Sequence, residues 1–364
     1  MGKYYWPVQG GIENHCYHLC ARLNRHVDLT VVVSNVTPRR VCERVHGVRV
    51  IRVPRYAQLA STPISPGIFR ELVGLRADIV HVHLPNPMAE VSYLLARPRG
   101  KLVVKYHSDV IRQKNIFRVY RPVTELFLSR AARNIATAPQ NVEHSPVLRK
   151  FTDRTRVIPL GIEPGQFERT PERAGRVAEL RRRFGDRVVF FIGRHVYYKG
   201  IDVLIRAMTH VDAHLVIAGA GPLTAELTAL ARSLGLDAKV SFVGRVADDE
   251  LPDYYHASDV FCLPSVARSE AFGIVQLEAM ASGLPVVNTR LDTGMSYVNL
   301  DGVTGLQVPP EDVEALAGAL NRLLDDPSLR RTLGEQARER VHREFTHDIN
   351  ARRTLELYAE ILAR

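Results

Sequence analysis

Short apolar runs alternate with longer amphipathic stretches along almost the whole chain. Continuous Val, Ile and Leu content over a few residues is typical of strands that are covered on both faces, as in a parallel sheet. The runs predict strands at 28–34, 48–54, 78–83, 101–107, 134–138, 156–159, 187–193, 214–219, 239–244, 259–264 and 285–289. The stretches between them predict helices, for example at 87–97 and 117–133.

Strand and helix alternate in both halves, which predicts two doubly wound, Rossmann-like α/β domains. A polar segment around 161–173 separates the halves, so we expect domains at 1–165 and 166–347. The last residues, 348–364, predict a helix that packs back on the first domain. Only Met1–Trp6 precede the Gly10-Gly11 turn, where a buried first strand is expected. We therefore expect an incomplete first strand, with the natural chain beginning upstream of Met1.

Composition excludes several classes of protein. The 364 residues are 46% hydrophobic and 24% charged, which excludes a disordered chain, a collagen-like repeat and a small disulfide scaffold. No run approaches the roughly 20 apolar residues of a membrane-spanning helix, and the N-terminus lacks a signal-peptide core, so we expect a cytoplasmic protein. Cys16 and Cys20 are one helical turn apart without a His/Cys pair at ligand spacing. They are interpreted as buried small hydrophobes, and no metal is expected.

Charge is distributed unequally between the two halves. Residues 1–163 contain 25 Lys+Arg and 11 Asp+Glu, a net charge of +14, whereas residues 164–364 have a net charge of −4. The basic half predicts an anionic partner such as a membrane surface, a phosphorylated lipid or nucleic acid, against the alternative of solubilising arginines. Within it, Arg112–Arg133 mixes apolar and cationic residues. This segment is interpreted either as a helix lying on anionic lipid or as one docked on its own sheet.

Ligands of open parallel sheets bind beyond the carboxyl ends of the strands, at helix N-termini. Gly10-Gly11 precede a predicted helix, and two glycines allow backbone amides to approach a phosphate, although a plain turn explains them equally well. His107 directly follows the strand LVVKYH. By itself it is interpreted equally well as a structural histidine.

Arg194 and Lys199 stand where a predicted strand ends and a helix starts. A helix N-terminus already has partial positive charge, so two cations there are unfavourable unless an anion binds between them. This pair therefore favours a diphosphate site over two solvated surface charges.

The most informative segment is Ser269–Val287, which contains Glu270, Gly273 and Glu278 around a predicted helix. Glycine near a helix start exposes amides, and Glu270 beside them can accept hydroxyl hydrogen bonds. Glu278 is flanked by apolar residues, and a buried carboxylate needs polar partners such as sugar or ribose hydroxyls. The alternative is that Glu270 stabilises the helix N-terminus and Glu278 is an ordinary surface residue.

These motifs, in this order, resemble the retaining glycosyltransferases of family 4. The similarity is carried by GRHVYYKG, by Glu-x7-Glu before SGLPVV, by the Gly10-Gly11 loop, and by VIPLGIEPGQF, GAGP, FVGRV and DGVTGLQVPP. It implies a GT-B fold, in which two Rossmann-like domains face each other across a cleft. KYYWPVQGGIENH, VHLPNP, KYHSDVIRQK and NTRLDTGMSYVNLDG are similar to members that extend polyprenyl-diphosphate-linked saccharides in exopolysaccharide assembly. Some of these members are mannosyltransferases that use GDP-mannose.

The resemblance implies a role for each matching residue. Arg194 and Lys199 would neutralise the donor diphosphate, and Glu278 would hold the nucleotide ribose. Glu270 would hold the donor sugar's hydroxyls, and His107 would lie near the reacting centre. The resemblance also implies donor-binding backbone or side-chain groups at Gly10, Gly11, Gly221, Arg245, Val246, Phe272, Gly273 and Ile274. One departure is Leu160, which stands where many members have an asparagine.

The expected activity is retaining transfer of a hexose, with mannose the leading donor sugar, from a nucleotide diphosphate sugar to a lipid-linked saccharide. Because cations and helix amides stabilise the leaving group, no metal or other cofactor is expected. A soluble acceptor and a GT-B nucleotide-sugar 2-epimerase are the alternatives. A dehydrogenase is disfavoured because GAGPLT lacks the third glycine of the dinucleotide-binding motif, and a nucleic-acid partner because no RNP-like or zinc motif is present.

Overall fold

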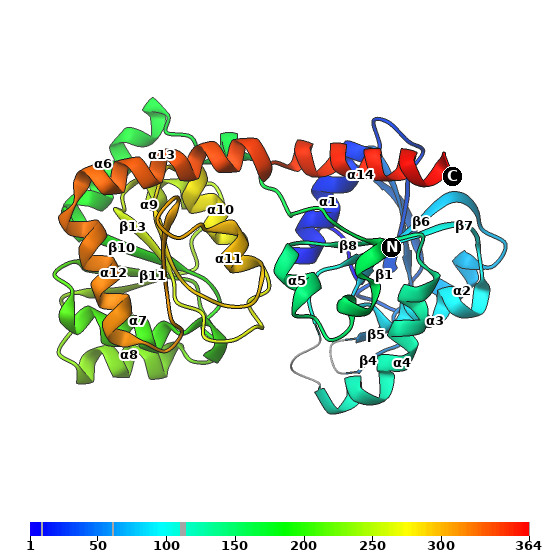
Figure 1. Cartoon of the computed structure of the whole chain (residues 1–364), viewed down its shortest axis with the longest axis horizontal. Coiled ribbons are helices and arrows are strands. Elements are labelled where there is room, and N and C mark those ends of the chain that lie inside the picture. Colours follow the sequence, from blue (N-terminus) through cyan, green and yellow to red (C-terminus); the bar gives the residue numbers. More distant parts are fainter. Residues whose placement is uncertain (9, 60–61, 110–113, 364) are drawn as a thin grey trace. The chain divides into compact units, whose positions relative to one another are not determined.

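The structure is a computed structural model that describes residues 1–8, 10–59, 62–109 and 114–363. The chain forms two compact units (Figure 1). Unit 1 contains Met1–Gly161 together with His347–Arg364, and unit 2 contains Ile162–Thr346. The resemblance to the family implies that residues 1–165 bind the acceptor and residues 166–347 bind the nucleotide sugar, and both roles stay predictions.

Unit 1 contains two main sheets and a short hairpin. One sheet has the order β1 (Thr30–Ser34), β3 (Val48–Val53), β2 (Val41–Val45), and the other has the order β6 (Arg76–Leu84), β7 (Arg99–Tyr106), β8 (Arg133–Ala136), β9 (Thr155–Val157). The hairpin pairs β4 (Ala57–Leu59) with β5 (Thr62–Ile64). Pairing is parallel in both main sheets except between β2 and β3. The expected parallel sheet is therefore correct apart from β2, an exposed antiparallel edge strand.

The segment Met1–Lys3 lies between the two main sheets and bonds to both. The amide of Gly2 donates to Val32 O, and the amide of Ser34 donates to Lys3 O, which joins the segment to β1. On its other side the amide of His83 donates to Met1 O, at 3.0 Å. These bonds tie β1 to β6, so the short segment takes the position that the sequence assigns to the first strand.

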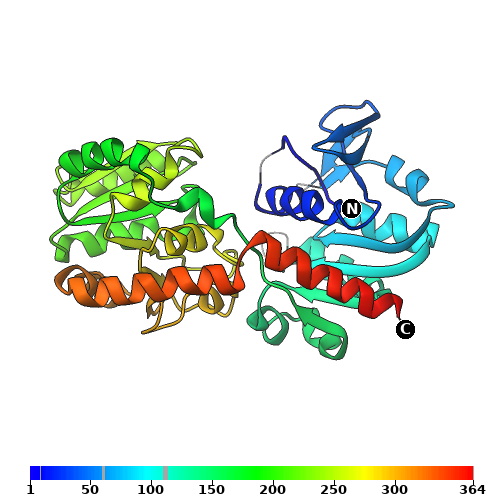
Figure 2. The ribbon, with the colours of Figure 1, turned by 90° about the horizontal axis from the view of Figure 1, so that it is seen from above.

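Helices cover both faces of the β6–β9 sheet, as expected of a doubly wound domain. The helices and 3₁₀ turn of unit 1 are α1 (Gly11–Leu23), α2 (Gly67–Leu72), α3 (Pro87–Ala96), α4 (Lys114–Arg130), α5 (Pro139–Glu143), η1 (Leu148–Arg154) and α14 (His347–Leu362). Val80, Val82 and Leu84 pack toward α3, α4 and α5. Val103 and Ile135 pack toward α1 and α14, which lie side by side (Figures 1 and 2).

Unit 2 is built on one parallel sheet of six strands. Their order is β12 (Val240–Gly244), β11 (His214–Ala218), β10 (Val188–Ile192), β13 (Val260–Leu263), β14 (Val286–Thr289), β15 (Gly305–Val308). Its helices are α6 (Ala174–Phe184), α7 (Ile201–Ala207), α8 (Thr224–Ser233), α9 (Leu251–His256), α10 (Ile274–Ala281), α11 (Gly294–Val298), α12 (Val313–Asp325) and α13 (Pro327–Glu344). Its 3₁₀ turns are η2 (Pro164–Phe167), η3 (Pro171–Arg173), η4 (Tyr197–Lys199) and η5 (Met208–His210). All its strands point the same way, so the loops after β10–β14 meet at one edge of the sheet.

Candidate active site

The loops that follow β10 and β13 are locked together at the carboxyl edge of the unit 2 sheet. Gly200 has φ +63°, and a Cβ there would lie 2.1 Å from Pro264 O, so only glycine fits this close approach. The amide of Val266 donates to Tyr198 O, at 2.8 Å. These contacts fix Lys199, on the first loop, against the loop that contains Glu270.

Lys199 and Glu270 form a direct ion pair, with 2.5 Å between Nζ and Oε2. Both residues are buried, with exposed fractions of 8% and 9%. Ser265 Oγ donates to the same Oε2, at 3.4 Å. The sequence assigned the two residues to different parts of the donor, and the structure brings them together. Because this pair is neutral as a unit, the positive charge on the loop after β10 comes from Arg194.

Arg194 follows β10 and is exposed. Its side chain has no hydrogen bond or ion pair with any residue in the described part of the chain. An exposed guanidinium can form two parallel hydrogen bonds with a phosphate group. Arg194 therefore has its hydrogen-bonding capacity available for an anionic ligand at the sheet edge.

The loop after Glu270 turns into α10 through Gly273. This residue has φ +68°, and a Cβ on it would lie 2.6 Å from Gln276 Nε2 and 2.9 Å from Leu263 Cδ2. The amides in the first turn of a helix have no partner within the helix. The helix start therefore presents the backbone N–H groups of Phe272, Gly273 and Ile274, as the sequence predicts. Their contact with a donor stays a prediction.

Glu278 lies one turn along α10 and is half-buried. The hydroxyl of Tyr255 donates to its Oε2, at 2.9 Å. Desolvation raises the pKa of Glu278 to about 7, and the nearby charge of Asp248 adds to this effect. The sequence gives no sign of Tyr255, because 23 residues separate it from its partner.

The raised pKa of Glu278 predicts that nucleotide affinity depends on pH. Ribose hydroxyls bond best to the ionised carboxylate, so affinity for the nucleotide should fall as the pH drops through about 7. We expect the dissociation constant of GDP, measured by calorimetry, to be about tenfold higher at pH 6 than at pH 8. Glu278→Gln should bind more weakly and lose most of this dependence. Equal affinity at both pH values in the wild-type protein would contradict a ribose contact with this carboxylate.

The other expected donor residues of unit 2 lie on neighbouring loops of the same sheet edge. Arg245, exposed, and Val246, partly exposed, follow β12 directly. A Cβ on Gly221 would lie 2.3 Å from His195 O, so this glycine lets the loop after β11 pack on the loop after β10. The structure therefore gives Gly221 a packing role, and its contact with a donor stays a prediction.

In unit 1, His107 follows β7 and is 5% exposed. Its Nε2 shares a hydrogen bond with Nδ1 of His83, at 3.0 Å. Desolvation, followed by the charge of Lys105, lowers the pKa of His107 to about 3. His107 is therefore neutral at pH 7 and can act there as a hydrogen-bonding group but not as an acid.

His107 belongs to a histidine cluster, which we define as His15, His81, His83 and His107. The rings of His15 and His107 have their centroids 5.4 Å apart, and those of His81 and His83 are stacked at 4.7 Å. Ring nitrogens of His15, His83 and His107 lie within 4.8 Å of one another. Nδ1 of His83 and Nε2 of His107 share a hydrogen bond, whereas neither ring nitrogen of His15 has a partner among the described residues. The alternation in VHVH and KYH places His81, His83 and His107 on one face of the sheet, a signal in the sequence from which their proximity could have been predicted. His15 joins them from α1.

The Gly10-Gly11 turn precedes α1, as expected, with Gly10 as its N-cap. A Cβ on Gly10 would lie 2.3 Å from Glu13 Oε2, so the Glu13 carboxylate lies over the helix start. A carboxylate at this position stabilises the positive end of a helix. A donor phosphate at Gly10 and Gly11 would have to displace it, and that contact stays a prediction.

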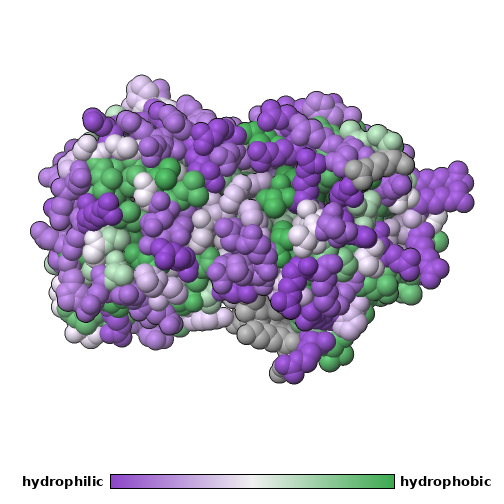
Figure 3. Space-filling model, in the orientation of Figure 1, coloured by the Kyte–Doolittle hydropathy of each residue, from purple (hydrophilic) through white to green (hydrophobic). Residues whose placement is uncertain are grey.

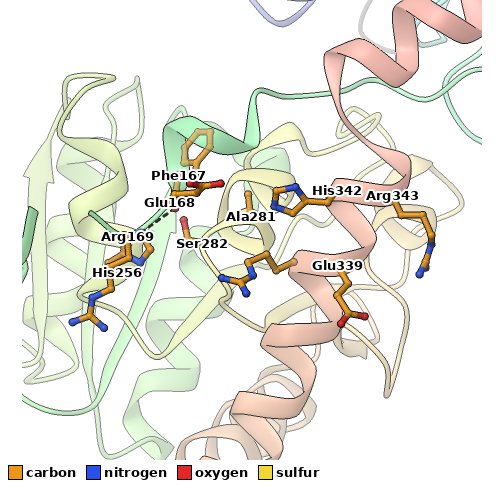
Figure 4. Close-up of a pocket in the computed structure, with 10 residues that line it drawn as sticks. Phe167, Glu168, Arg169, His256, Ala281, Ser282, Glu339, His342 and Arg343 are labelled. Carbon is orange, nitrogen blue, oxygen red and sulfur yellow. Dashed lines mark hydrogen bonds between the residues drawn. The ribbon is translucent and has the colours of Figure 1, made fainter. Parts of the chain in front are cut away.

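A pocket of about 960 Å³ lies elsewhere in unit 2 (Figure 4). It is lined by Phe167, Glu168, Arg169, His256, Ala281, Ser282, Arg338, Glu339, His342 and Arg343. Ala281 and Ser282 are at the C-terminal end of α10, whereas Gly273 is at its N-terminal end. None of the expected donor residues lines this pocket, so the site is assigned from the chemistry of the strand-end loops instead.

Comparisons with known proteins agree with this geometry. Residues 9–166 match the family described as "Glycosyltransferase Family 4", and residues 177–340 match "Glycosyl transferases group 1". The chain is 34% identical over 364 residues to the O-antigen chain mannosyltransferase C of Escherichia coli, covering 99% of this chain and 96% of the relative. It is 36% identical over 340 residues to the D-rhamnosyltransferase WbpZ of Pseudomonas aeruginosa, covering 93% of this chain and 88% of the relative.

Among solved structures, the sucrose-phosphate synthase of Thermosynechococcus elongatus superposes with a TM-score of 0.78 at 26% identity, covering 97% of this chain and 94% of the other. These matches confirm the GT-B architecture and a glycosyltransferase activity, which favours a transferase over the alternative of a nucleotide-sugar epimerase. The protein belongs to glycosyltransferase family 4.

Proposed function

We propose that the protein transfers mannose, with retention at the anomeric carbon, from GDP-mannose to a lipid-linked saccharide during the synthesis of a cell-surface polysaccharide. The similarity to an O-antigen chain mannosyltransferase and to a D-rhamnosyltransferase supports a related sugar and a glycan acceptor. The observation that carries the proposal is the buried Lys199–Glu270 ion pair at the carboxyl edge of the unit 2 sheet, with Arg194 exposed on the same loop as Lys199 and Glu278 on α10, the helix that follows Glu270. The cations suit a diphosphate, and the carboxylates suit the hydroxyl groups of a ribose and of a sugar.

The mechanism follows from the charge that develops as the bond from sugar to phosphate breaks. The departing diphosphate gains negative charge, which Arg194, Lys199 and the first-turn amides of α10 would stabilise. Glu270 accepts from Lys199 through Oε2, and its other oxygen would accept from a hydroxyl of the donor sugar. By resemblance to the family, the acceptor attacks from the same face and passes its proton to the leaving phosphate.

The test is to follow GDP release from GDP-mannose with and without a polyprenyl-diphosphate-linked saccharide, and to assign the product's anomeric configuration by NMR. We expect acceptor-dependent GDP release and an α-linked product, with Glu270→Gln at least tenfold slower. UDP-glucose and a soluble saccharide serve as the alternative donor and acceptor. Turnover with UDP-glucose but not GDP-mannose would contradict the donor assignment, and a β-linked product would contradict retention.

Metal independence is a separate prediction. If the cations Arg194 and Lys199 neutralise the diphosphate, no metal is needed for that role, and we expect the same kcat in excess EDTA as in untreated buffer. Addition of Mg²⁺ or Mn²⁺ should leave kcat unchanged. Activity that disappears in EDTA and returns with either ion would contradict this prediction.

The basic charge of unit 1 supports attachment to the inner face of the cell membrane, near a lipid-linked acceptor. None of the helices in the described part of the chain is long and apolar enough to cross a bilayer. Within the expected segment 112–133, Arg112 and Gln113 lie outside the described residues. Phe127 and Leu128 are fully buried, whereas Val119 is 83% and Leu126 48% exposed, two turns apart on α4. Most of this apolar face therefore packs inward, and attachment would be mainly electrostatic.

We accordingly expect the protein to co-sediment with anionic liposomes, to bind neutral liposomes little, and to be released as salt rises. The surface that Figure 3 shows is largely hydrophilic, which fits a reversible contact rather than insertion. Val119→Ser should weaken binding slightly, whereas charge removal at Arg118 and Arg130, exposed on the same helix, should weaken it strongly. Equal binding to both lipid types, or none at low salt, would contradict attachment and favour a soluble acceptor.

A further inference from the structure

A chain of buried polar side chains crosses unit 2 from the first turn of α10 to the loop before β15. Its members are Gln276, Asn288, Asn299 and Thr304, with exposed fractions of 0–1%. Asn288 Nδ2 donates to Gln276 Oε1 at 2.7 Å, and Asn299 Nδ2 donates to Asn288 Oδ1 at 3.0 Å. Thr304 Oγ1 donates to Asn299 Oδ1, at 2.8 Å. The first member of this polar chain lies beside the candidate donor site.

Gln276 connects the polar chain to the loop that contains Glu270. Its Nε2 donates to the carbonyl oxygen of Phe272, at 3.3 Å. In a planar trans peptide the carbonyl and the following N–H point in opposite directions. The bond to Phe272 O therefore turns the N–H of Gly273 away from Gln276. The bond thereby fixes the orientation of the Phe272–Gly273 peptide, close to Glu270 in the chain.

Packing makes Gln276 and Gly273 depend on each other. A Cβ on Gly273 would lie 2.6 Å from Gln276 Nε2, so the side-chain amide fills the space that a larger residue would need. The neighbouring Ala271 O accepts from the amide of Gly294, which holds the loop from a second side. A buried amide must have its hydrogen bonds satisfied, whereas an apolar side chain of similar volume would pack here without that requirement.

We propose that Gln276 is a positioning residue for the sugar-transfer reaction. The bond from Gln276 to Phe272 O orients the Phe272–Gly273 peptide, and Asn288 holds the side-chain amide of Gln276 in place. The oriented peptide in turn keeps Glu270 in contact with Lys199. The proposal rests on the donor-binding role proposed for Glu270 and the amides after it. It adds a residue with no direct contact to the donor, whose effect passes through the loop.

The first test compares Gln276→Met with a matched control, Gln307→Met. Gln307 is also in unit 2 and uses its amide nitrogen to donate to Ser296 O and Asn299 O, but it makes no bond to the 270–273 loop. We expect amide hydrogen exchange at residues 271–274, measured without any donor, to be at least tenfold faster in Gln276→Met. Gln307→Met should exchange there at the wild-type rate.

Kinetics provide the second measurement. Gln276→Met should lower kcat/KM for the donor at least tenfold and leave KM for the acceptor unchanged, whereas Gln307→Met should resemble the wild type. If the wild-type protein turns over neither GDP-mannose nor UDP-glucose, the proposed function fails, and the exchange comparison still decides the positioning role. Wild-type exchange in Gln276→Met, or an equal change in both variants, would overturn the proposal.

Gln276→Glu keeps the test decisive if Gln276→Met does not fold. A protonated Glu side chain can donate to Phe272 O and accept from Asn288 Nδ2, whereas the carboxylate cannot donate. We expect the turnover of Gln276→Glu, relative to wild type at each pH, to rise as the pH falls. A ratio independent of pH would overturn the role of this hydrogen bond.

Discussion

Arg194→Ala is expected to lower kcat about 10²–10³-fold, the loss typical of removing one donor that stabilises developing negative charge. Arg194 is exposed and its side chain has no bond to the described residues, so the same change should leave the melting temperature as it is. Lys199→Ala should lower kcat as strongly and also destabilise the fold, because it leaves the buried Glu270 carboxylate without its cation. Removing one partner of a buried pair costs about 3–5 kcal/mol. Turnover and thermal unfolding of the two variants, measured together, separate the two effects.

The matched control is Arg182→Ala, an exposed arginine on α6 of the same unit. It should have the kcat and melting temperature of the wild type. Wild-type kcat and KM in Arg194→Ala would contradict the assignment of this arginine to the diphosphate. An unchanged melting temperature in Lys199→Ala would mean that the pair with Glu270 contributes little to the fold.

The parts of the fold that sequence could predict are those with a buried apolar pattern. The runs at 187–193 and 214–219 contain β10 and β11, and the pattern at 348–364 matches α14. Strand β2, with sequence VCERV, was missed because four of its five residues are exposed and it lacks an apolar run. β15 was missed because its short sequence, GLQV, sits inside a glycine-rich stretch that is also typical of a turn.

In the candidate site, sequence could predict residue types but not which residues touch. Lys199 and Glu270 are 71 positions apart, and no local periodicity relates them. Their contact arises because β10 and β13 are neighbours in the sheet, which brings the two following loops to one edge. Tyr255 and Glu278 lie on helices α9 and α10, and their contact depends on how these helices pack in the folded unit. Tertiary arrangement, not local pattern, thus decides the pairs in the site.

Unit 1 is expected to unfold in mild acid, well before unit 2. Desolvation holds the pKa of His15, His81 and His83 well below the usual value, and that of His107 at about 3. An unfolded histidine has a pKa near 6.5 and binds a proton that the folded one does not. Because the folded pKa is the lower one, the stability is present above pH 6.5 and is lost as the pH falls toward 3.

The expected loss is large compared with the stability of a domain. Between pH 7.5 and 5.5 each unfolded histidine takes up most of a proton that its folded counterpart does not, so each member of the histidine cluster costs on the order of 1 kcal/mol and the four together cost several kcal/mol. Glu90 acts in the opposite sense, because desolvation raises its pKa to about 7. Its protonation between pH 7.5 and 5.5 stabilises unit 1 by about 2 kcal/mol. Desolvation lowers the pKa of Lys105 to about 7, so its charged amine destabilises the fold at pH 7 and below, and this penalty shrinks as the pH rises above 7. The net loss is still a substantial part of the roughly 5–15 kcal/mol of a typical domain.

The measurement is thermal unfolding between pH 7.5 and 5.0, with hydrogen exchange to assign each transition to a unit. His15→Leu gives the sharpest comparison, because neither ring nitrogen of His15 has a hydrogen-bond partner among the described residues and the side chain is 3% exposed. Leucine cannot take up a proton, so the stability of the variant relative to the wild type should increase by on the order of 1 kcal/mol as the pH falls from 7.5 to 5.5. A melting temperature of unit 1 that stays constant from pH 7.5 to 5.0 would contradict a neutral, desolvated cluster. If the melting temperature of unit 1 depended on pH equally in His15→Leu and in the wild type, His15 would not contribute to the acid sensitivity.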